Sequence, residues 1–153
     1  MNSEESVLFA RKYLEDILSF FGVNINVDAT LEDEVIELTV PSTDESSVLI
    51  GRGGETLRSL QYMVSTALRN KDAELVRVNV DIAGYKRQHA EKVAEQARGW
   101  IEEVRKTGDS YVASLNAADR RTVHRVATEY EDIETFSEGE GRDRKLIIAQ
   151  KSS

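Results

Sequence analysis

The chain lacks cysteine altogether and has no long hydrophobic run. Without cysteine it can form neither a disulfide nor a thiolate metal site, and this composition suits a reducing compartment. No apolar stretch approaches the ~20 residues that cross a bilayer, and the polar, acidic start does not resemble a secretory signal. We therefore expect a cytoplasmic protein without an integral membrane segment.

Histidine is nearly absent as well, with His89 and His124 as its two occurrences. Neither belongs to a His-Glu-x-x-His frame, so the sequence offers no set of metal ligands. Acidic residues and serines are abundant, but no spacing among them singles out a catalytic pair. We predict no metal, no cofactor and no catalytic residue, and hence a protein that is not an enzyme.

Positive charge is also in deficit, with 20 basic against 28 acidic side chains and a net charge of −8. Most of the excess acid lies in residues 1–50, ahead of a glycine-rich turn. An acidic protein can still bind nucleic acid where basic side chains gather locally, because salt screens charges beyond ~8 Å. We expect any such affinity to be modest, since few phosphates can be neutralised at once.

Hydrophobic periodicity predicts an α+β fold in two small domains. The expected elements of the first are a helix from Ser3 or Ser6 to Phe21, strands at Val23–Ala29 and Glu34–Val40, a short helix ending at Ile50, a helix at Glu55–Asn70 and a strand at Leu75–Ile82. A long helix at Tyr85–Lys106 then leads to a strand at Ser110–Leu115, a helix at Asn116–Tyr130 and strands at Ile133–Phe136 and Lys145–Ala149. Gly84 marks the boundary, which gives domains at residues 1–84 and 85–153.

The turn Ile50-Gly51-Arg52-Gly53-Gly54 separates two of the expected helices. Gly51 can take the left-handed conformation that ends a helix, and the missing Cβ atoms let another backbone lie against the loop. Amides that open the next helix favour phosphate, and Arg52 adds a positive charge. The alternative is a flexible connection between helices with no binding role.

A Gly-x-x-Gly loop between two helices, with Ile50 before it and Leu57 after it, resembles the loop of a KH domain. The helix-strand-strand-helix-helix-strand order fits as well, and the resemblance covers residues 3–83. KH domains hold about four single-stranded nucleotides, with the backbone on the loop and the bases in an apolar groove. The resemblance implies phosphate contacts from the loop residues, which are Gly51, Arg52, Gly53 and Gly54. It places Ile50, Leu57 and Leu60 near the groove floor, where an ordinary core position is the alternative for each and is favoured for Leu60.

A basic helix around Asp119–Arg125 carries a second signal. Arg120 and His124 are four residues apart and therefore project from one face, one turn above the other. Arg offers a planar fork for phosphate, and His can donate to phosphate or stack on a base. Arg121 and Arg125 form a neighbouring pair with the same spacing. The alternative is a solvated basic face.

An Arg-x-x-x-His helix followed by the turn at residues 137–141 and by Arg144 resembles the R-three-H domain, a module for single-stranded nucleic acid. The resemblance implies a second contact made by Arg120 and His124, supported by Arg121 and Arg144. A KH domain joined to an R-three-H domain resembles the bacterial Jag family, also called KhpB, EloR or SpoIIIJ-associated proteins. The resemblance implies a binder of single-stranded RNA, in the role of a post-transcriptional regulator.

Two departures from this family concern the start of the chain and the loop. Many members carry an additional N-terminal Jag domain, whereas this sequence starts at the first KH helix, so we expect that domain to be lacking. Many relatives also have a second basic residue in the glycine loop and a Gln after it, where this chain has Gly53 and Glu55. We therefore expect this loop to attract phosphate less strongly.

The competing hypothesis is a protein–protein adaptor, serving a cell-division or membrane-insertion complex with little RNA binding. KH-like folds can serve as adaptor surfaces, and the acidic first third suits a basic partner. The family resemblance also suggests a small single-KH protein as a partner, and homodimerisation is a further alternative. RNA binding is favoured if the basic positions line one continuous surface, and the adaptor is favoured if they are scattered or buried in ion pairs. These positions are Arg52, Arg77, Arg120 and His124.

Overall fold

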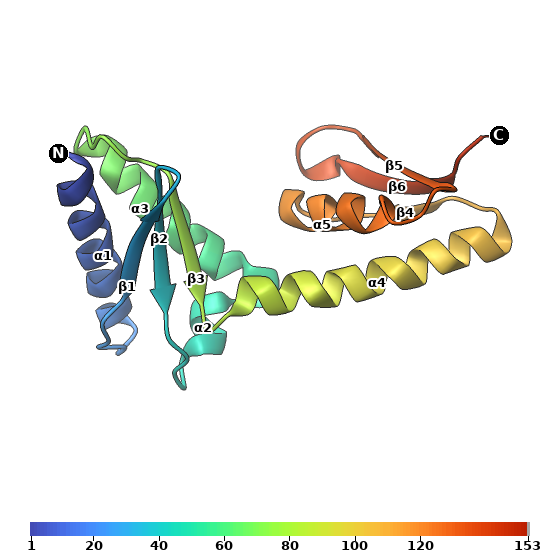
Figure 1. The fold of residues 1–153 in the computed structure, drawn as a ribbon. Helices are drawn as coiled ribbons and strands as arrows, with labels where there is room; N and C mark the ends of the chain where they lie inside the picture. The colour runs from blue at the N-terminus through green and yellow to red at the C-terminus, as the bar shows by residue number, and fades with distance from the viewer. Residues whose placement is uncertain (153) are drawn as a thin grey trace. The chain divides into compact units, whose positions relative to one another are not determined.

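The computed structural model describes residues 1–152, apart from the side chain of Arg142. The chain divides into two compact units, one from Met1 to Lys86 and the other beginning at Arg87 (Figure 1). Each unit combines helices with a three-stranded sheet, so the predicted α+β class is confirmed. In the described part of the chain, no helix is long and apolar enough to span a membrane.

The first unit holds three helices, one 3₁₀ turn and three strands. Its elements in chain order are α1 (Ser3–Phe20), β1 (Asp28–Glu32), β2 (Val35–Val40), α2 (Ser46–Ile50), η1 (Arg52–Gly54), α3 (Glu55–Asn70) and β3 (Val78–Ile82). The sheet has the order β1-β2-β3, with β1 antiparallel and β3 parallel to β2. The parallel pairing forces the chain to return through α2 and α3, and this return creates the glycine loop between them.

The prediction of a strand at Val23–Ala29 is wrong, because β1 begins only at Asp28. The alternating valines are buried, but their backbone bonds to α1 and not to a strand. The Val23 amide donates to Leu18 O at 3.1 Å, and the Val27 amide donates to the carboxylate of Glu15 at 2.8 Å. The first helix also starts differently, since Asn2 caps it by accepting a hydrogen bond from the Glu5 amide at 2.8 Å.

The core of the first unit lies between the sheet and helices α1 and α3. Alternate residues of β2 and β3 are buried, among them Leu38 and Val80, and they pack with the apolar stripes of both helices. Helix α3 also covers the open edge of β3. The Val80 amide donates to Gln61 Oε1 at 2.9 Å, which satisfies a strand-edge donor and fixes α3 beside β3. This packing determines where the loop before α3 lies.

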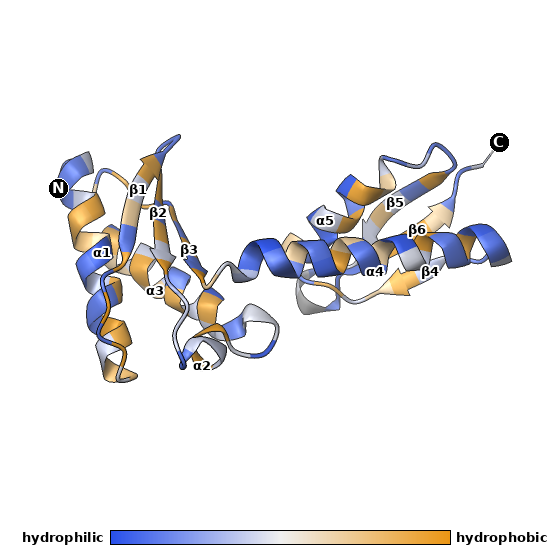
Figure 2. Cartoon of the chain, turned by 60° about the horizontal axis from the view of Figure 1, so that its bottom comes forward, coloured by the Kyte–Doolittle hydropathy of each residue, from blue (hydrophilic) through white to orange (hydrophobic). Residues whose placement is uncertain are grey.

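The second unit contains two helices, a 3₁₀ turn and an antiparallel sheet. Its elements are α4 (Tyr85–Thr107), β4 (Tyr111–Ala113), α5 (Ala117–Ala127), β5 (Ile133–Glu138), η2 (Gly141–Asp143) and β6 (Lys145–Gln150). The first two residues of α4 belong to the first unit. The strand order is β4-β6-β5. Asn116 caps α5, as predicted, by accepting a hydrogen bond from the Asp119 amide at 2.9 Å. Figure 2 shows hydrophobic residues recurring along the mostly hydrophilic α4, and those at Val93, Ala97 and Ile101 are buried in the core.

Candidate nucleic-acid interface

The glycine loop of the first unit has a left-handed backbone at three positions. Gly51, Gly53 and Gly54 have φ angles of 74°, 59° and 78°. A Cβ at Gly51 would lie 2.9 Å from the Cβ of Thr56, and one at Gly54 would lie 2.8 Å from the ring of Tyr85. A Cβ at Gly53 would meet no heavy atom within 4 Å. Two glycines are therefore required by close packing, and the third faces open space.

Two backbone amides of the loop donate to carbonyl oxygens of the protein, and two do not. The Gly51 amide donates to Ser47 O at 2.9 Å, and the Gly54 amide donates to Gly51 O at 3.2 Å. Among the residues that the structure describes, the amides of Arg52 and Gly53 have no such acceptor. These two positions are the variable ones of Gly-x-x-Gly. An anion that reaches the loop would meet two backbone donors there.

The side chains predicted around the loop fall into two groups. Arg52 is exposed, and within residues 1–152 its guanidinium pairs with no carboxylate. Ile50 is partly buried and packs against the core, with some of its surface left accessible. Leu57 is only 1% exposed and belongs to the core. We therefore correct the assignment of Leu57 from the nucleic-acid surface to the core. Gly54 is also buried, so it shapes the turn and does not form part of the binding surface.

Arg58 is a neighbour of the loop that sequence reasoning missed. It lies on α3, one turn after Gly54, and its Nη1 donates to Gly53 O at 2.7 Å. The same nitrogen would be 3.2 Å from a Cβ at Gly54, so the guanidinium lies directly over the loop backbone. Arg77 is different, because it precedes β3 while the loop contacts Tyr85, beyond the other end of that strand. Arg52 and Arg77 thus lie near opposite ends of β3 and are not immediate neighbours.

A polar network beside the loop surrounds Lys86. Its Nζ donates to Gln61 Oε1 at 2.8 Å and also contacts Asn79 Oδ1, while its amide donates to Asp81 Oδ1 at 3.1 Å. Burial lowers the pKa of Lys86 from 10.5, and the charge of Arg58 acts in the same direction; the carboxylates of Asp81 and Glu37 oppose the shift. The network holds the start of α4 against the end of β3 and against α3.

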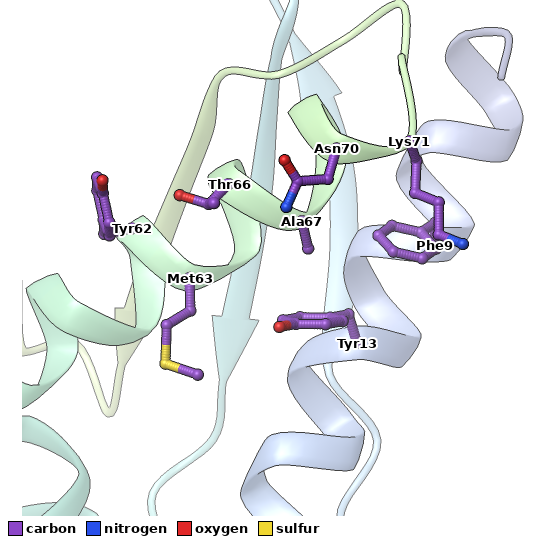
Figure 3. Close-up of a pocket in the computed structure, with 8 residues that line it drawn as sticks. All are labelled: Phe9, Tyr13, Tyr62, Met63, Thr66, Ala67, Asn70 and Lys71. Atoms are coloured by element: carbon purple, nitrogen blue, oxygen red, sulfur yellow. The ribbon is translucent and has the colours of Figure 1, made fainter.

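A hollow of about 360 Å³ lies elsewhere in the first unit, between α1 and α3 (Figure 3). Phe9 and Tyr13 face it from α1, and their rings stack with centroids 5.8 Å apart. Tyr62 and Met63 border it from α3 and are 69% and 43% exposed. The hollow is mainly apolar, so its chemistry differs from that of the glycine loop.

In the second unit, Arg120 and His124 occupy one face of α5, as their spacing predicts. Each side chain already has a protein partner. Arg120 Nη1 donates to Leu115 O at 2.6 Å, and His124 Nδ1 is hydrogen-bonded to Thr135 Oγ1 on β5. Thr135 therefore fixes the orientation of the imidazole ring and leaves Nε2 as the nitrogen that can meet a ligand. Sequence reasoning missed Thr135 because the contact joins two elements.

A pocket of about 420 Å³ opens beside His124. Ala127 and Ile133 contribute its apolar part. Its polar part includes Thr135 and Lys151 and also the carboxylates of Glu131 and Glu134. The volume lies within the range of small-ligand sites and is sufficient for a single base. The second unit thus places an oriented histidine at the rim of a small cavity.

Two further predicted residues lie at other places on the second unit. Arg121 is exposed on the neighbouring strip of α5, about 100° around the helix from Arg120. Arg144 is exposed at the end of η2, just before β6. Thr135, which contacts His124, pairs with Ile148 on β6. Arg144 precedes Ile148 by four residues, which corresponds to about 13 Å of extended chain. The backbone does not bring Arg144 into the immediate surroundings of His124.

Comparison with known families accounts for both units. Residues 8–82 match the family described as KhpA/KhpB, KH domain, and residues 90–150 match the R-three-H domain family. The first match contains the glycine loop, and the second contains the Arg120–His124 face. The chain thus joins a KH domain of the KhpA/KhpB type to an R-three-H domain. Its first unit is the KH domain and its second is the R-three-H domain.

Three proteins named RNA-binding protein KhpB are similar over most of this chain. The one from Clostridium symbiosum is 27% identical over 144 residues, which make up 93% of this chain and 65% of that protein. The one from Bacillus subtilis is 26% identical over 145 residues, or 93% and 69%. The one from Lactiplantibacillus plantarum is 24% identical over 148 residues, or 96% and 46%. The chain thus spans about two thirds of the first two relatives and less than half of the third.

Proposed function

We propose that this two-domain protein binds single-stranded RNA through two surfaces and acts without catalysis. The proposal rests on the geometry of the glycine loop. The amides of Arg52 and Gly53 and the Arg52 side chain have no partner among the described residues, and the loop surface at Gly53 is open. Similarity to proteins named for RNA binding supports it, as does the presence of two nucleic-acid domains in one chain.

On the KH domain, the RNA backbone would lie across Arg52 and Gly53. Their amides donate to a phosphate, the Arg52 side chain adds charge, and Gly53 leaves room for close approach. Gly51 and Gly54 hold the loop in shape by packing on Thr56 and Tyr85. Ile50 offers apolar surface next to the loop, where a base can rest.

On the R-three-H domain, Arg120 and His124 would form the second contact. One N–H of Arg120 holds Leu115 O, and the others are available for phosphate. His124, oriented by Thr135, can donate from Nε2 to a phosphate or stack on a base at the adjacent pocket. Arg121 and Arg144 would add long-range charge to this domain.

The experiment is a titration of labelled, randomised short single-stranded RNA with the full chain, followed by fluorescence anisotropy at several salt concentrations. We expect the double variant Arg52→Asp with Gly53→Asp to weaken binding at low salt. Arg120→Ala with His124→Ala should weaken it and flatten the plot of log K against log salt by about 0.7 for each phosphate that the protein no longer binds. Folded double variants with unchanged affinity and slope would remove these residues from the site.

We further propose that the protein works in the cytoplasm as a post-transcriptional regulator. Crosslinking to cellular RNA, followed by sequencing of the bound fragments, tests this role. Recovery of defined transcripts that disappear in the Arg52→Asp, Gly53→Asp variant is the expected outcome. If the wild type and the double variant recover the same RNA fragments, the proposed role is contradicted.

A protein partner is the second element of the proposal. The hollow between α1 and α3 exposes Tyr62 and Met63 away from the glycine loop, which suits a small single-KH protein or a second copy of this chain. Analytical ultracentrifugation of the wild type and of Tyr62→Ser with Met63→Ser, alone and with such a partner, tests this. If the wild type and the double variant form the same oligomers and complexes, the hollow is not the interface.

A further inference from the structure

Arg58 lies next to a loop that is short of positive charge. Arg52 is the one basic side chain within Gly51–Gly54, and Glu55 follows directly with an opposite, exposed charge. On charge alone, the loop should attract a phosphate weakly. Arg58 brings a second guanidinium to the same place from the first turns of α3.

The hydrogen bond of Arg58 fixes where that guanidinium lies. Nη1 donates to Gly53 O at 2.7 Å, although the side chain is exposed to solvent. A guanidinium has five N–H donors in one plane, and this contact uses one of them. The others lie beside Gly53, whose own amide has no acceptor in the part of the chain that the structure describes.

The positive charge of Arg58 has no carboxylate partner within residues 1–152. No Asp or Glu of that range lies within ion-pair distance of it, whereas Arg98 and Arg105 of the R-three-H domain each have two acidic neighbours. Besides burial, the positive charge of Arg58 lowers the pKa of Lys86, at the start of α4. An exposed guanidinium held by a single backbone bond is available for an anion.

We propose that Arg58 is a second phosphate-binding residue of the KH domain, which supplies from α3 the charge that the loop lacks at Gly53. One N–H holds the Gly53 carbonyl, and the remaining donors bind the RNA phosphate that meets the amides of Arg52 and Gly53. Arg52 and Arg58 then grip the backbone from the two ends of the loop. This inference rests on the proposed function, that is, on RNA binding at the glycine loop.

The test compares single substitutions in the full chain with randomised short single-stranded RNA as the probe. Arg58→Gln is the variant, Arg52→Gln is the reference for a loop contact, and Arg69→Gln is the matched control. Arg69 is an exposed arginine of the same helix, in its last turn, and its removal changes the net charge equally. We expect Arg58→Gln to weaken binding about five- to tenfold at low salt and to reduce the salt slope by about 0.7, with little change for Arg69→Gln.

Arg58→Lys separates phosphate binding from support of the loop. A lysine keeps the charge but cannot hold Gly53 O and a phosphate with one planar fork. We expect it to retain the wild-type salt slope and to lose less affinity than Arg58→Gln. Hydrogen exchange of the Gly54 amide reports on loop order in every variant. Weaker binding with a wild-type slope and faster Gly54 exchange in Arg58→Gln would show a structural role alone and overturn the inference.

The remaining outcomes distinguish this inference from the proposed function. If Arg52→Gln reduces the salt slope and Arg58→Gln does not, the loop binds RNA and Arg58 is not a contact. If the wild type binds no RNA, both proposals fail. If it binds RNA but neither substitution changes binding, the loop is not the site, and this inference fails together with the KH part of the proposed function.

Discussion

The aromatic ring of Tyr85 lies against Gly54, so closely that a Cβ there would be 2.8 Å from Tyr85 Cε1. This contact joins the glycine loop of the KH domain to the first residue of α4, the helix that continues into the R-three-H domain. The loop is therefore shaped by the residue that follows β3 as well as by its own sequence. Lys86, the next residue, strengthens this attachment through Gln61 and Asp81.

The first prediction concerns the two glycines at the end of the loop. Gly54→Ala should destabilise the KH domain by about 2–4 kcal/mol, because the methyl group adds a clash with Tyr85 to the cost of left-handed backbone. Gly53→Ala should cost about 1–2 kcal/mol, since its position is open. Urea unfolding followed by circular dichroism measures both. Equal losses would show that the Tyr85 contact is unimportant.

The single tryptophan, Trp100, provides the control for this comparison. It lies in the R-three-H domain, stacked on Tyr111 with centroids 5.0 Å apart. Its fluorescence should therefore follow the unfolding of that domain and should not change with either glycine substitution. A shift of the Trp100 transition would place part of the effect outside the KH domain.

The second prediction concerns the acidic residue after the loop. Glu55→Gln should tighten RNA binding by a few-fold at low salt, because it removes a negative charge beside Arg52. The gain should shrink as salt increases. Glu4→Gln, in the first turn of α1, changes the net charge equally at another place and is the control. A similar gain in RNA affinity from both variants would show that the net charge of the protein, and not the position of Glu55, causes the gain.

The third prediction concerns Lys86, whose pKa burial lowers from 10.5. Between the lowered pKa and 10.5 the unfolded chain binds more protons than the folded one, so stability rises with pH across that window. The free energy of unfolding of the wild type should therefore rise relative to Lys86→Met as pH increases from neutrality toward 10.5. Parallel urea titrations measure the difference. A constant difference would mean that Lys86 titrates normally in the folded protein.

The order of elements and both domain types could be predicted because each rests on a local pattern. The stripe of α3 and the cap at Asn116 are encoded within a few residues, and the structure has both. The segment Val23–Val27 alternates like a strand, yet Glu15 and Leu18 of α1 accept its amide hydrogen bonds. Alternation shows which residues are buried, and tertiary contacts decide what their backbone does.

The candidate site was predictable to the same extent. The glycines and the Arg120–His124 pair stand out by spacing, and the structure gives each a definite geometry. Arg58 looks like any exposed helical arginine, because its contact depends on the direction of the Gly53 carbonyl. Leu57 shows the reverse error, since an apolar residue after the loop fits a groove or a core equally well until its burial is known.

The fourth prediction concerns the support of His124 by Thr135. Thr135→Val removes the hydroxyl that orients the imidazole ring but leaves the size and charge of the side chain nearly unchanged. We expect RNA affinity to fall several-fold and the stability of the R-three-H domain to fall by about 1 kcal/mol. Thr107→Val, at the end of α4, is the control. It also removes a hydroxyl, which donates to Glu103 O and accepts from the Asp109 amide. Equal effects of the two would contradict an orienting role.

The fifth prediction concerns the two tasks of Arg120. Its Nη1 holds Leu115 O at 2.6 Å, which ties α5 to the segment after β4, while its other N–H groups are available for phosphate. Arg120→Lys should weaken RNA binding about tenfold and lower the Trp100-monitored stability by about 1 kcal/mol, because an ammonium cannot make both contacts. Arg121→Lys, on the exposed neighbouring strip, should change affinity less than about twofold and leave stability unchanged. Equivalent behaviour of the two lysine variants would mean that charge alone matters on this helix and that the bond to Leu115 does not position Arg120.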